Sequence, residues 1–63
     1  MLNKEVPATR ENLRCGDHVA FDYQGQRYEG LFVTLNKRAT VVVPRHGKFY
    51  IVLRHLWKVI HEG

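Results

Sequence analysis

Short apolar runs alternate with polar, glycine-containing turns along most of this chain of 63 residues. From Asp17 onward the runs are rich in β-branched and aromatic residues, and glycine interrupts them at short intervals. This pattern is typical of a small antiparallel meander. We predict strands at residues 17–23, 27–35, 39–45, 48–53 and 58–61, joined by turns at 24–26, 36–38 and 46–47.

Two short segments are predicted to be helical. In residues 7–17, PATRENLRCGD, Thr9 is a suitable N-cap and Gly16 a suitable C-terminal stop for one helical turn. Residues 54–58, RHLWK, are expected to form a single-turn helix before the last strand. The chain shows no repeat and no internal linker, so we expect a single β domain.

The glycines and the C-terminal ending carry a family resemblance. The stretch GDHVAFDYQGQRYEGLFVTLNKRATVVV is followed by a glycine turn, YIV and HLWKVI. This order resembles SH3-like small barrels of the KOW and Tudor type, in which a GD-V opening, a G-x-V second strand, an N-K/R turn and a closing single-turn helix recur. The resemblance implies an all-β, five-stranded antiparallel SH3-like barrel at residues 16–63, preceded by an N-terminal tail and short helical turn at residues 1–15. Such barrels bind RNA, DNA, peptides or one another, so the ligand stays open.

The hairpin over residues 39–53 is apolar on both faces. With a two-residue turn at 46–47, Val42 pairs with Ile51. Directly opposed residues share a face, and the resemblance implies that the face with Tyr50 lines the barrel core. The other face is then a large apolar patch that points outward, and monomers rarely expose such patches. Unless the N-terminal segment covers it, this patch is a predicted protein interface, made of Val42, Pro44, Phe49, Ile51 and Leu53.

Positive charge is concentrated in the C-terminal half. The net charge is +4. Residues 1–30 carry four Lys/Arg against five Asp/Glu, whereas residues 31–61 carry six Lys/Arg and no carboxylate. A segment with charge of one sign is the footprint expected of a polyanion-binding surface. The alternative is that the charge only keeps a small domain soluble.

The turns of the meander should bring these cations close to aromatic side chains. Alternate turns lie at the same end, so we expect Tyr28 beside His46 at one end, and Lys37 and Arg54 near Trp57 at the other. Cations position phosphates and aromatic faces stack bases, as a single-stranded nucleic-acid site requires. With Tyr28 or Phe49 as the stacking surface, the predicted nucleic-acid-binding residues are Arg27, Tyr28, Lys37, Arg38, Arg45, His46, Lys48 and Arg54.

The sequence offers little for catalysis or metal binding. A domain of this size buries only about 60% of its unfolded surface, so a large catalytic cleft is not expected. The chain has no serine, and Cys15 is its only cysteine, which excludes a Ser nucleophile and an intrachain disulfide. Cys15 and His18 have half the spacing of a zinc site, without a second close-spaced pair. We therefore predict no enzymatic activity, no cofactor and no metal site.

GDHV, QRYEG and the strand-then-helix ending are also similar to the plasmid-borne trimethoprim-resistant dihydrofolate reductases. These are SH3-like barrels that build one active pore from four subunits. Their pore-lining strand reads V-Q-I-Y, whereas the equivalent stretch here, FYIV, lacks the amide needed to read a pterin. This second resemblance therefore implies a shared fold only.

We conclude from the sequence that the chain is a non-enzymatic binding module. The first hypothesis is nucleic-acid binding, to RNA or DNA, through the basic turns and exposed aromatics. The alternative is a protein-interaction or assembly module, with a protein partner or a homo-oligomer formed through the apolar face. No apolar run approaches the roughly 20 residues that span a bilayer. The N-terminus lacks the apolar region of a signal peptide, so we expect a cytoplasmic protein without a membrane partner.

Overall fold

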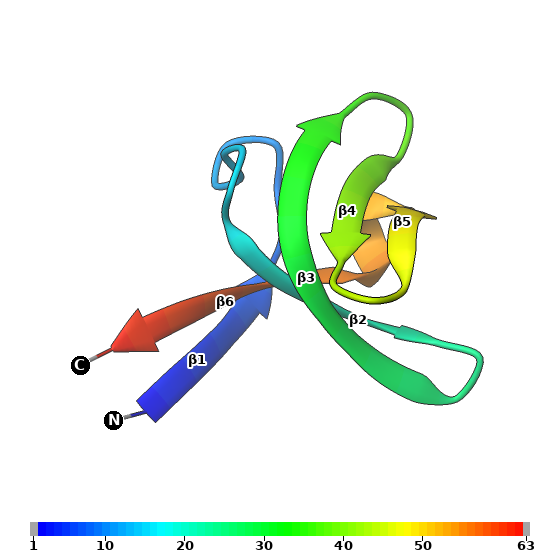
Figure 1. Cartoon of the computed structure of the whole chain (residues 1–63). Coiled ribbons are helices and arrows are strands. Elements are labelled where there is room, and N and C mark those ends of the chain that lie inside the picture. Colours follow the sequence, from blue (N-terminus) through cyan, green and yellow to red (C-terminus); the bar gives the residue numbers. More distant parts are fainter. Residues whose placement is uncertain (1, 63) are drawn as a thin grey trace.

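A single antiparallel sheet of six strands forms the protein, in a computed structural model that describes residues 2–62 and the side chains of residues 4–61. The order in the sheet is β1-β6-β2-β3-β4-β5, so β1 and β5 are its edges and the described sheet is not closed (Figure 1). The elements are β1 (Leu2–Pro7), β2 (His18–Tyr23), β3 (Gln26–Leu35), β4 (Ala39–Val43), β5 (Gly47–Ile51), a 3-10 turn η1 (Leu53–His55) and β6 (Leu56–Glu62).

The all-β class agrees with the sequence-based prediction, but the number of strands and the closure of the barrel do not. The five predicted strands are present within two residues of their expected ends. The additional strand is β1, which lies in the segment predicted to be a tail. It pairs with β6 from Leu2 opposite Glu62 to Pro7 opposite Trp57. Pro7 cannot donate a ladder hydrogen bond, and an edge strand tolerates this loss.

Neither predicted helical segment has the expected form. Thr9 and Asn12 do cap each other: the Asn12 N–H donates to Thr9 Oγ1 at 3.1 Å, and the Thr9 N–H donates to Asn12 Oδ1 at 2.8 Å. The chain between them is a single hydrogen-bonded turn and not a helix. The helix predicted at residues 54–58 is reduced to the 3-10 turn η1, because Leu56 and the residues after it pair with β2.

The β4–β5 connection is one residue longer than predicted, and this changes which side chains face the core. Val43 pairs with Gly47, and Val41 pairs with Phe49. The loop therefore contains three residues, with positive φ at Arg45 (71°) and at Gly47 (90°). A register change by an odd number of residues exchanges the two faces of a strand. As a result Phe49 faces the core and Tyr50 faces outward, the reverse of the prediction.

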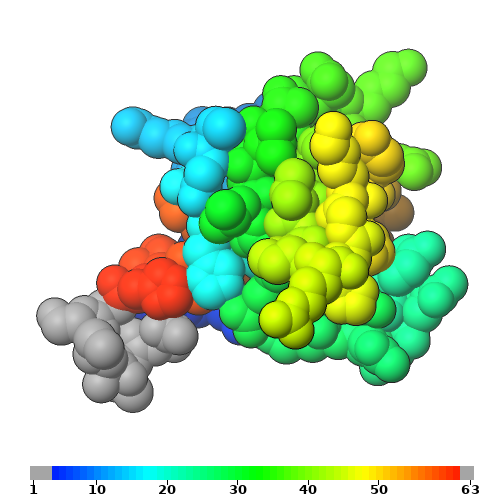
Figure 2. Space-filling view, in the orientation of Figure 1, coloured from blue at the N-terminus to red at the C-terminus, as the bar shows by residue number. Residues whose placement is uncertain are grey.

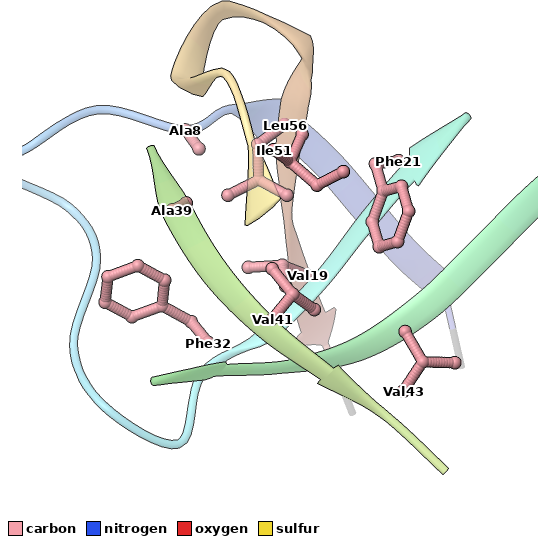
Figure 3. Close-up of a cluster of buried hydrophobic side chains, with 9 residues drawn as sticks. All are labelled: Ala8, Val19, Phe21, Phe32, Ala39, Val41, Val43, Ile51 and Leu56. Atoms are coloured by element: carbon pink, nitrogen blue, oxygen red, sulfur yellow. The ribbon is translucent and has the colours of Figure 1, made fainter. Parts of the chain in front are cut away.

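The core lies on the concave side of the curled sheet, where apolar side chains from five strands converge (Figure 3). Gly30 lets β3 and β4 approach each other closely there. A Cβ at this position would lie 2.9 Å from Val41 Cγ1 and closer still to the carbonyl oxygen of Val42. The buried cluster consists of Ala8, Val19, Phe21, Phe32, Ala39, Val41, Val43, Ile51 and Leu56.

Candidate functional site

Ion pairs gather in the half of the sheet that contains β1, β6, β2 and β3, and in the described structure the β4–β5 half carries unpaired positive charge. Arg27 on β3 pairs with Glu5 on β1 and lies 3.5 Å from Glu29 on its own strand. Lys58 on β6 lies 3.3 Å from Asp17. Within the described part of the chain, the other cations of the C-terminal half make no ion pair: Lys37, Arg38, Arg45, Lys48 and Arg54. Positive charge from the β3–β4 turn to η1 is therefore uncompensated.

A hollow of about 630 Å³ lies between the β3–β4 turn and β5, and we call it the turn hollow. Its lining residues are Asn36, Lys37, Arg38, Thr40 and Tyr50. The Asn36 N–H donates to the Arg38 carbonyl at 3.2 Å and closes the turn. Thr40 stands directly opposite Tyr50, so both side chains share the outer face. Tyr50 is 61% exposed, and Figure 2 shows the turn standing out at the upper edge of the molecule beside β5.

A second hollow, of about 380 Å³, lies on the outer face nearer to the β4–β5 turn. Leu31 forms its apolar wall, and we call it the Leu31 hollow. Leu31 stands between His18 on β2 and Val42 on β4 and is 51% exposed. The other lining residues are His18, Glu29, Gly30 and Pro44. The hollow thus combines an apolar wall with a hydrogen-bonding rim.

A chain of polar contacts borders the Leu31 hollow. His18 Nε2 lies 2.8 Å from Glu29 Oε1, and His18 Nδ1 lies 2.6 Å from His61 Nε2. The two imidazole rings are stacked with centroids 4.8 Å apart, and Figure 2 shows the end of β6 against the start of β2. Arg27 continues the chain from Glu29 to Glu5, where its Nη1 donates to Glu5 Oε1 at 3.2 Å. The contacts therefore connect β6, β2, β3 and β1.

These contacts change the pKa of two groups. Burial alone would raise the pKa of Glu29, but the hydrogen bonds from His18 and Arg27 outweigh it and hold this pKa below its usual value of 4.5. The hydrogen bond to Glu5 raises the pKa of Arg27. Glu29 is accordingly ionised at neutral pH, and its carboxylate can only accept hydrogen bonds.

The same polar chain covers two apolar residues on the outer face. Ala20 stands opposite Glu29, and Val59 stands opposite Glu5. Both apolar residues are buried, although neither belongs to the main core cluster. Arg27 joins the two glutamates and so has a structural role, while its side chain stays 43% exposed.

The two aromatic residues predicted to stack bases are part of the edge of the core. The ring of Tyr28 stacks on Phe21 with centroids 5.6 Å apart, and the ring of Phe49 lies 5.2 Å from each of them. Tyr28 also contacts His46 edge-on at 5.3 Å, so these two residues do lie at one end of the sheet as expected. Tyr28 and Phe49 are half-buried and offer no free ring face comparable to that of Tyr50.

The remaining predicted binding residues are exposed. Lys37 and Arg38 line the turn hollow. Of the other four, Arg45 and His46 lie in the β4–β5 turn, Lys48 lies at the start of β5, and Arg54 lies on η1.

The predicted apolar interface is divided by the observed register. Val42 is half-buried on the outer face, and Pro44 is exposed. Ile51 is buried in the core cluster, while Phe49 and Leu53 pack against that cluster. The continuous outward patch inferred from a two-residue turn is therefore absent from the described surface.

Tyr50, the aromatic residue that lines the turn hollow, was not among the predicted site residues, because the predicted register placed it in the core. The signal that bears on it is the sequence PRHGK, in which Gly47 can begin a strand with positive φ and lengthen the loop. Leu31, His18 and Glu29 were also missed. They come together through the pairing of β2 with β3, in which Tyr23 pairs with Gln26, so the turn is one residue shorter than the one expected at residues 24–26.

Comparison with known proteins gives no family assignment, since no family model, no curated protein and no solved structure matches this chain. None of the described residues belongs to a helix of the length and hydrophobicity that a membrane crossing requires. Among the same residues, no three His, Cys, Asp or Glu side chains gather in a metal-binding arrangement. The two hollows and the charges around them are therefore the candidate functional site.

Proposed function

We propose that this chain is a non-enzymatic module that binds single-stranded nucleic acid, RNA or DNA, at the turn hollow. The observation that carries the proposal is the placement of an exposed ring, Tyr50, beside two cations without carboxylate partners in the described structure, Lys37 and Arg38. Cations hold the phosphates, and the ring provides a face on which a base can stack.

The polar residues of the turn hollow fit the same ligand. Asn36 provides an amide and Thr40 a hydroxyl, groups that hydrogen-bond to sugars, phosphates and base edges. The β4 and β5 strands hold Thr40 and Tyr50 on a rigid sheet, which limits the entropy lost on binding. A shallow site with one aromatic platform suits an unpaired strand, because the bases of a duplex are stacked and closed to a side chain.

The fold adds support by analogy. Strands β2-β3-β4-β5 form an antiparallel meander and β6 pairs with β2, which is compatible with the arrangement that the resemblance to SH3-like barrels of the KOW and Tudor type implies. Many such barrels bind nucleic acid, although fold alone does not fix function. The single cysteine, exposed at Cys15, suits a reducing compartment, and we place the module in the cytoplasm.

The test is fluorescence anisotropy with labelled single-stranded RNA, single-stranded DNA and duplex DNA. We expect binding of a single strand in the micromolar range, and a loss of at least about tenfold in the charge-reversed variant Lys37→Glu/Arg38→Glu. The matched control is Arg10→Glu/Arg14→Glu, which changes the net charge equally on the exposed β1–β2 connection. Equal losses in the two double variants would show a diffuse charge effect and no site at the turn.

Tyr50→Ala separates stacking from charge. Base stacking on an aromatic ring contributes about 1–3 kcal/mol per base, so this variant should bind at least about fivefold more weakly without a change in net charge. Unchanged affinity in Tyr50→Ala would remove the aromatic platform from the proposal.

An assembly module is the second candidate, and the exposure of Leu31 is the observation that favours it. Leu31 is 51% exposed and lies next to Val42 and close to Pro44, so a reduced apolar strip remains on the outer face. Assembly through this strip predicts a dimer in sedimentation velocity that Leu31→Asp converts to a monomer. A wild-type monomer at the highest concentration measured would rule this candidate out.

A further inference from the structure

The two hollows lie along one face of a single strand. Thr40, Val42 and Pro44 occupy every second position along β4 and the residue that follows it, and alternate residues of a strand share a face. Thr40 lines the turn hollow, and Pro44 lines the Leu31 hollow. Thr40 and Pro44 are four positions apart in the extended chain, which corresponds to about 13 Å.

Positive charge continues along this face from one hollow to the other. Lys48 stands directly opposite Val42 and so lies between the two hollows. Arg45 follows Pro44 at the end of the Leu31 hollow, and Lys37 and Arg38 stand at the far end. In the described part of the chain none of these four cations has a carboxylate partner. A polyanion that starts at the turn hollow therefore meets further cations in the direction of the Leu31 hollow.

We propose that the Leu31 hollow receives a second, unstacked base of the same strand and favours cytosine over uracil through the carboxylate of Glu29. This inference rests on the proposed function and extends it with a path and a base preference. The spacing of about 13 Å corresponds to about four base rises of about 3.4 Å, so the base that enters the Leu31 hollow lies a few nucleotides along the same strand from the base at Tyr50.

The lining of the Leu31 hollow fits a base with an exocyclic amine. Leu31 and Pro44 provide apolar contact for the faces of the ring. The Glu29 carboxylate, fixed by His18 and Arg27, accepts a hydrogen bond from the N4 amino group of cytosine. Uracil presents a carbonyl oxygen at the equivalent position. An ionised carboxylate cannot donate to that oxygen, so the two acceptors repel each other.

The experiment compares labelled cytosine and uracil hexanucleotides, each as RNA and as DNA. Wild type should bind the cytosine strand about tenfold more tightly than the uracil strand, the size of one good base contact. Glu29→Gln should reduce this preference to less than about twofold, because an amide can either donate or accept. The matched control Glu11→Gln removes an exposed carboxylate from the β1–β2 connection and should keep the full preference.

Glu29 also forms hydrogen bonds with His18 and Arg27, so Glu29→Gln could lose binding because it is less stable. A second variant, Leu31→Ala, tests the same hollow without removing these hydrogen bonds. Leu31 is exposed, so Leu31→Ala should leave the thermal unfolding midpoint within about 4 °C of wild type. It should weaken the binding of both hexanucleotides by about fivefold through loss of the apolar wall. These results together with the lost preference of Glu29→Gln would support the second base site.

Other outcomes overturn the inference in distinguishable ways. If wild type binds both hexanucleotides equally while Tyr50→Ala still weakens binding, the second base site is wrong and the proposed function stands. If no hexanucleotide binds, both fail together. If Leu31→Asp converts a wild-type dimer to a monomer, the face belongs to a protein contact and the base site is wrong.

Discussion

Two neighbouring aromatic residues test the register on which the candidate site depends. Phe49 and Tyr50 are adjacent on β5 and therefore face opposite sides of the sheet. Phe49 packs against the core with its ring 5.2 Å from those of Phe21 and Tyr28, whereas Tyr50 is 61% exposed. The structure therefore predicts that Phe49→Ala is far more destabilising than Tyr50→Ala.

The difference can be estimated from burial. Truncation of a fully buried Phe to Ala costs about 3–5 kcal/mol, and Phe49 is half-buried, so we expect a loss of about 2 kcal/mol. For Tyr50→Ala we expect a change within about 0.5 kcal/mol, as for most exposed positions. In a domain of this size these values correspond to a shift of about 8–16 °C in the unfolding midpoint for Phe49→Ala and less than about 4 °C for Tyr50→Ala.

Urea unfolding followed by circular dichroism measures both variants against wild type. If the free energy of unfolding depends on urea concentration with the same slope in the variants and in wild type, the substitutions have changed stability alone. If Tyr50→Ala were the more destabilising change, the hairpin would have the two-residue turn and Tyr50 would lie in the core. The turn hollow would then lose its aromatic platform, and the proposed site would be wrong.

Three further predictions follow from the packing and the polar chain. Gly30→Ala should lower the free energy of unfolding by about 1–3 kcal/mol in urea, because the added Cβ would lie 2.9 Å from Val41 Cγ1 and closer still to the backbone carbonyl oxygen of Val42. A loss below about 0.5 kcal/mol would contradict these contacts. Because the pKa of Glu29 is lowered in the folded state, its carboxylate stabilises the fold above pH 4.5, and this contribution is lost as the pH falls through the folded-state pKa. The urea concentration at the unfolding midpoint should therefore fall less steeply with decreasing pH in Glu29→Gln than in wild type. The control Glu11→Gln should keep the wild-type pH dependence. Arg27→Ala removes the bridge to β1 and should cost up to about 1 kcal/mol, with faster hydrogen exchange of the β1 amides; unchanged exchange there would show that the bridge does not hold the strand.

The positions of five strands were predictable because each is a local run of β-branched and aromatic residues bounded by glycine or polar turns. β1 was not, since its partner is β6 at the other end of the chain and its own sequence, LNKEVP, is short and ends in proline. The N-terminal turn shows the same limit. Thr9 and Asn12 form the expected capping contacts, but the chain turns back to the sheet before a helix can continue.

Of the candidate site, only the positively charged residues could be predicted from the sequence. Lys37 and Arg38 were identified because the C-terminal half carries cations of one sign, and this needs no tertiary information. The aromatic partner was misassigned, because Phe49 and Tyr50 are both large and mainly apolar, and their alternation cannot decide which of them is buried. One additional residue in the β4–β5 loop decides it. The contact of Glu29 with His18 depends on the register of the β2–β3 hairpin, whose turn is one residue shorter than the predicted one.

The salt dependence of single-strand binding tests the central claim most directly. With three phosphate contacts, from Lys37, Arg38 and Lys48, the affinity of wild type should vary with about the −2.1 power of salt concentration, a loss of about 18-fold between 50 and 200 mM. The variant Lys37→Gln/Arg38→Gln retains one of these contacts and should lose only about threefold over the same range. A slope that is the same in wild type and in this variant would contradict phosphate binding at the β3–β4 turn.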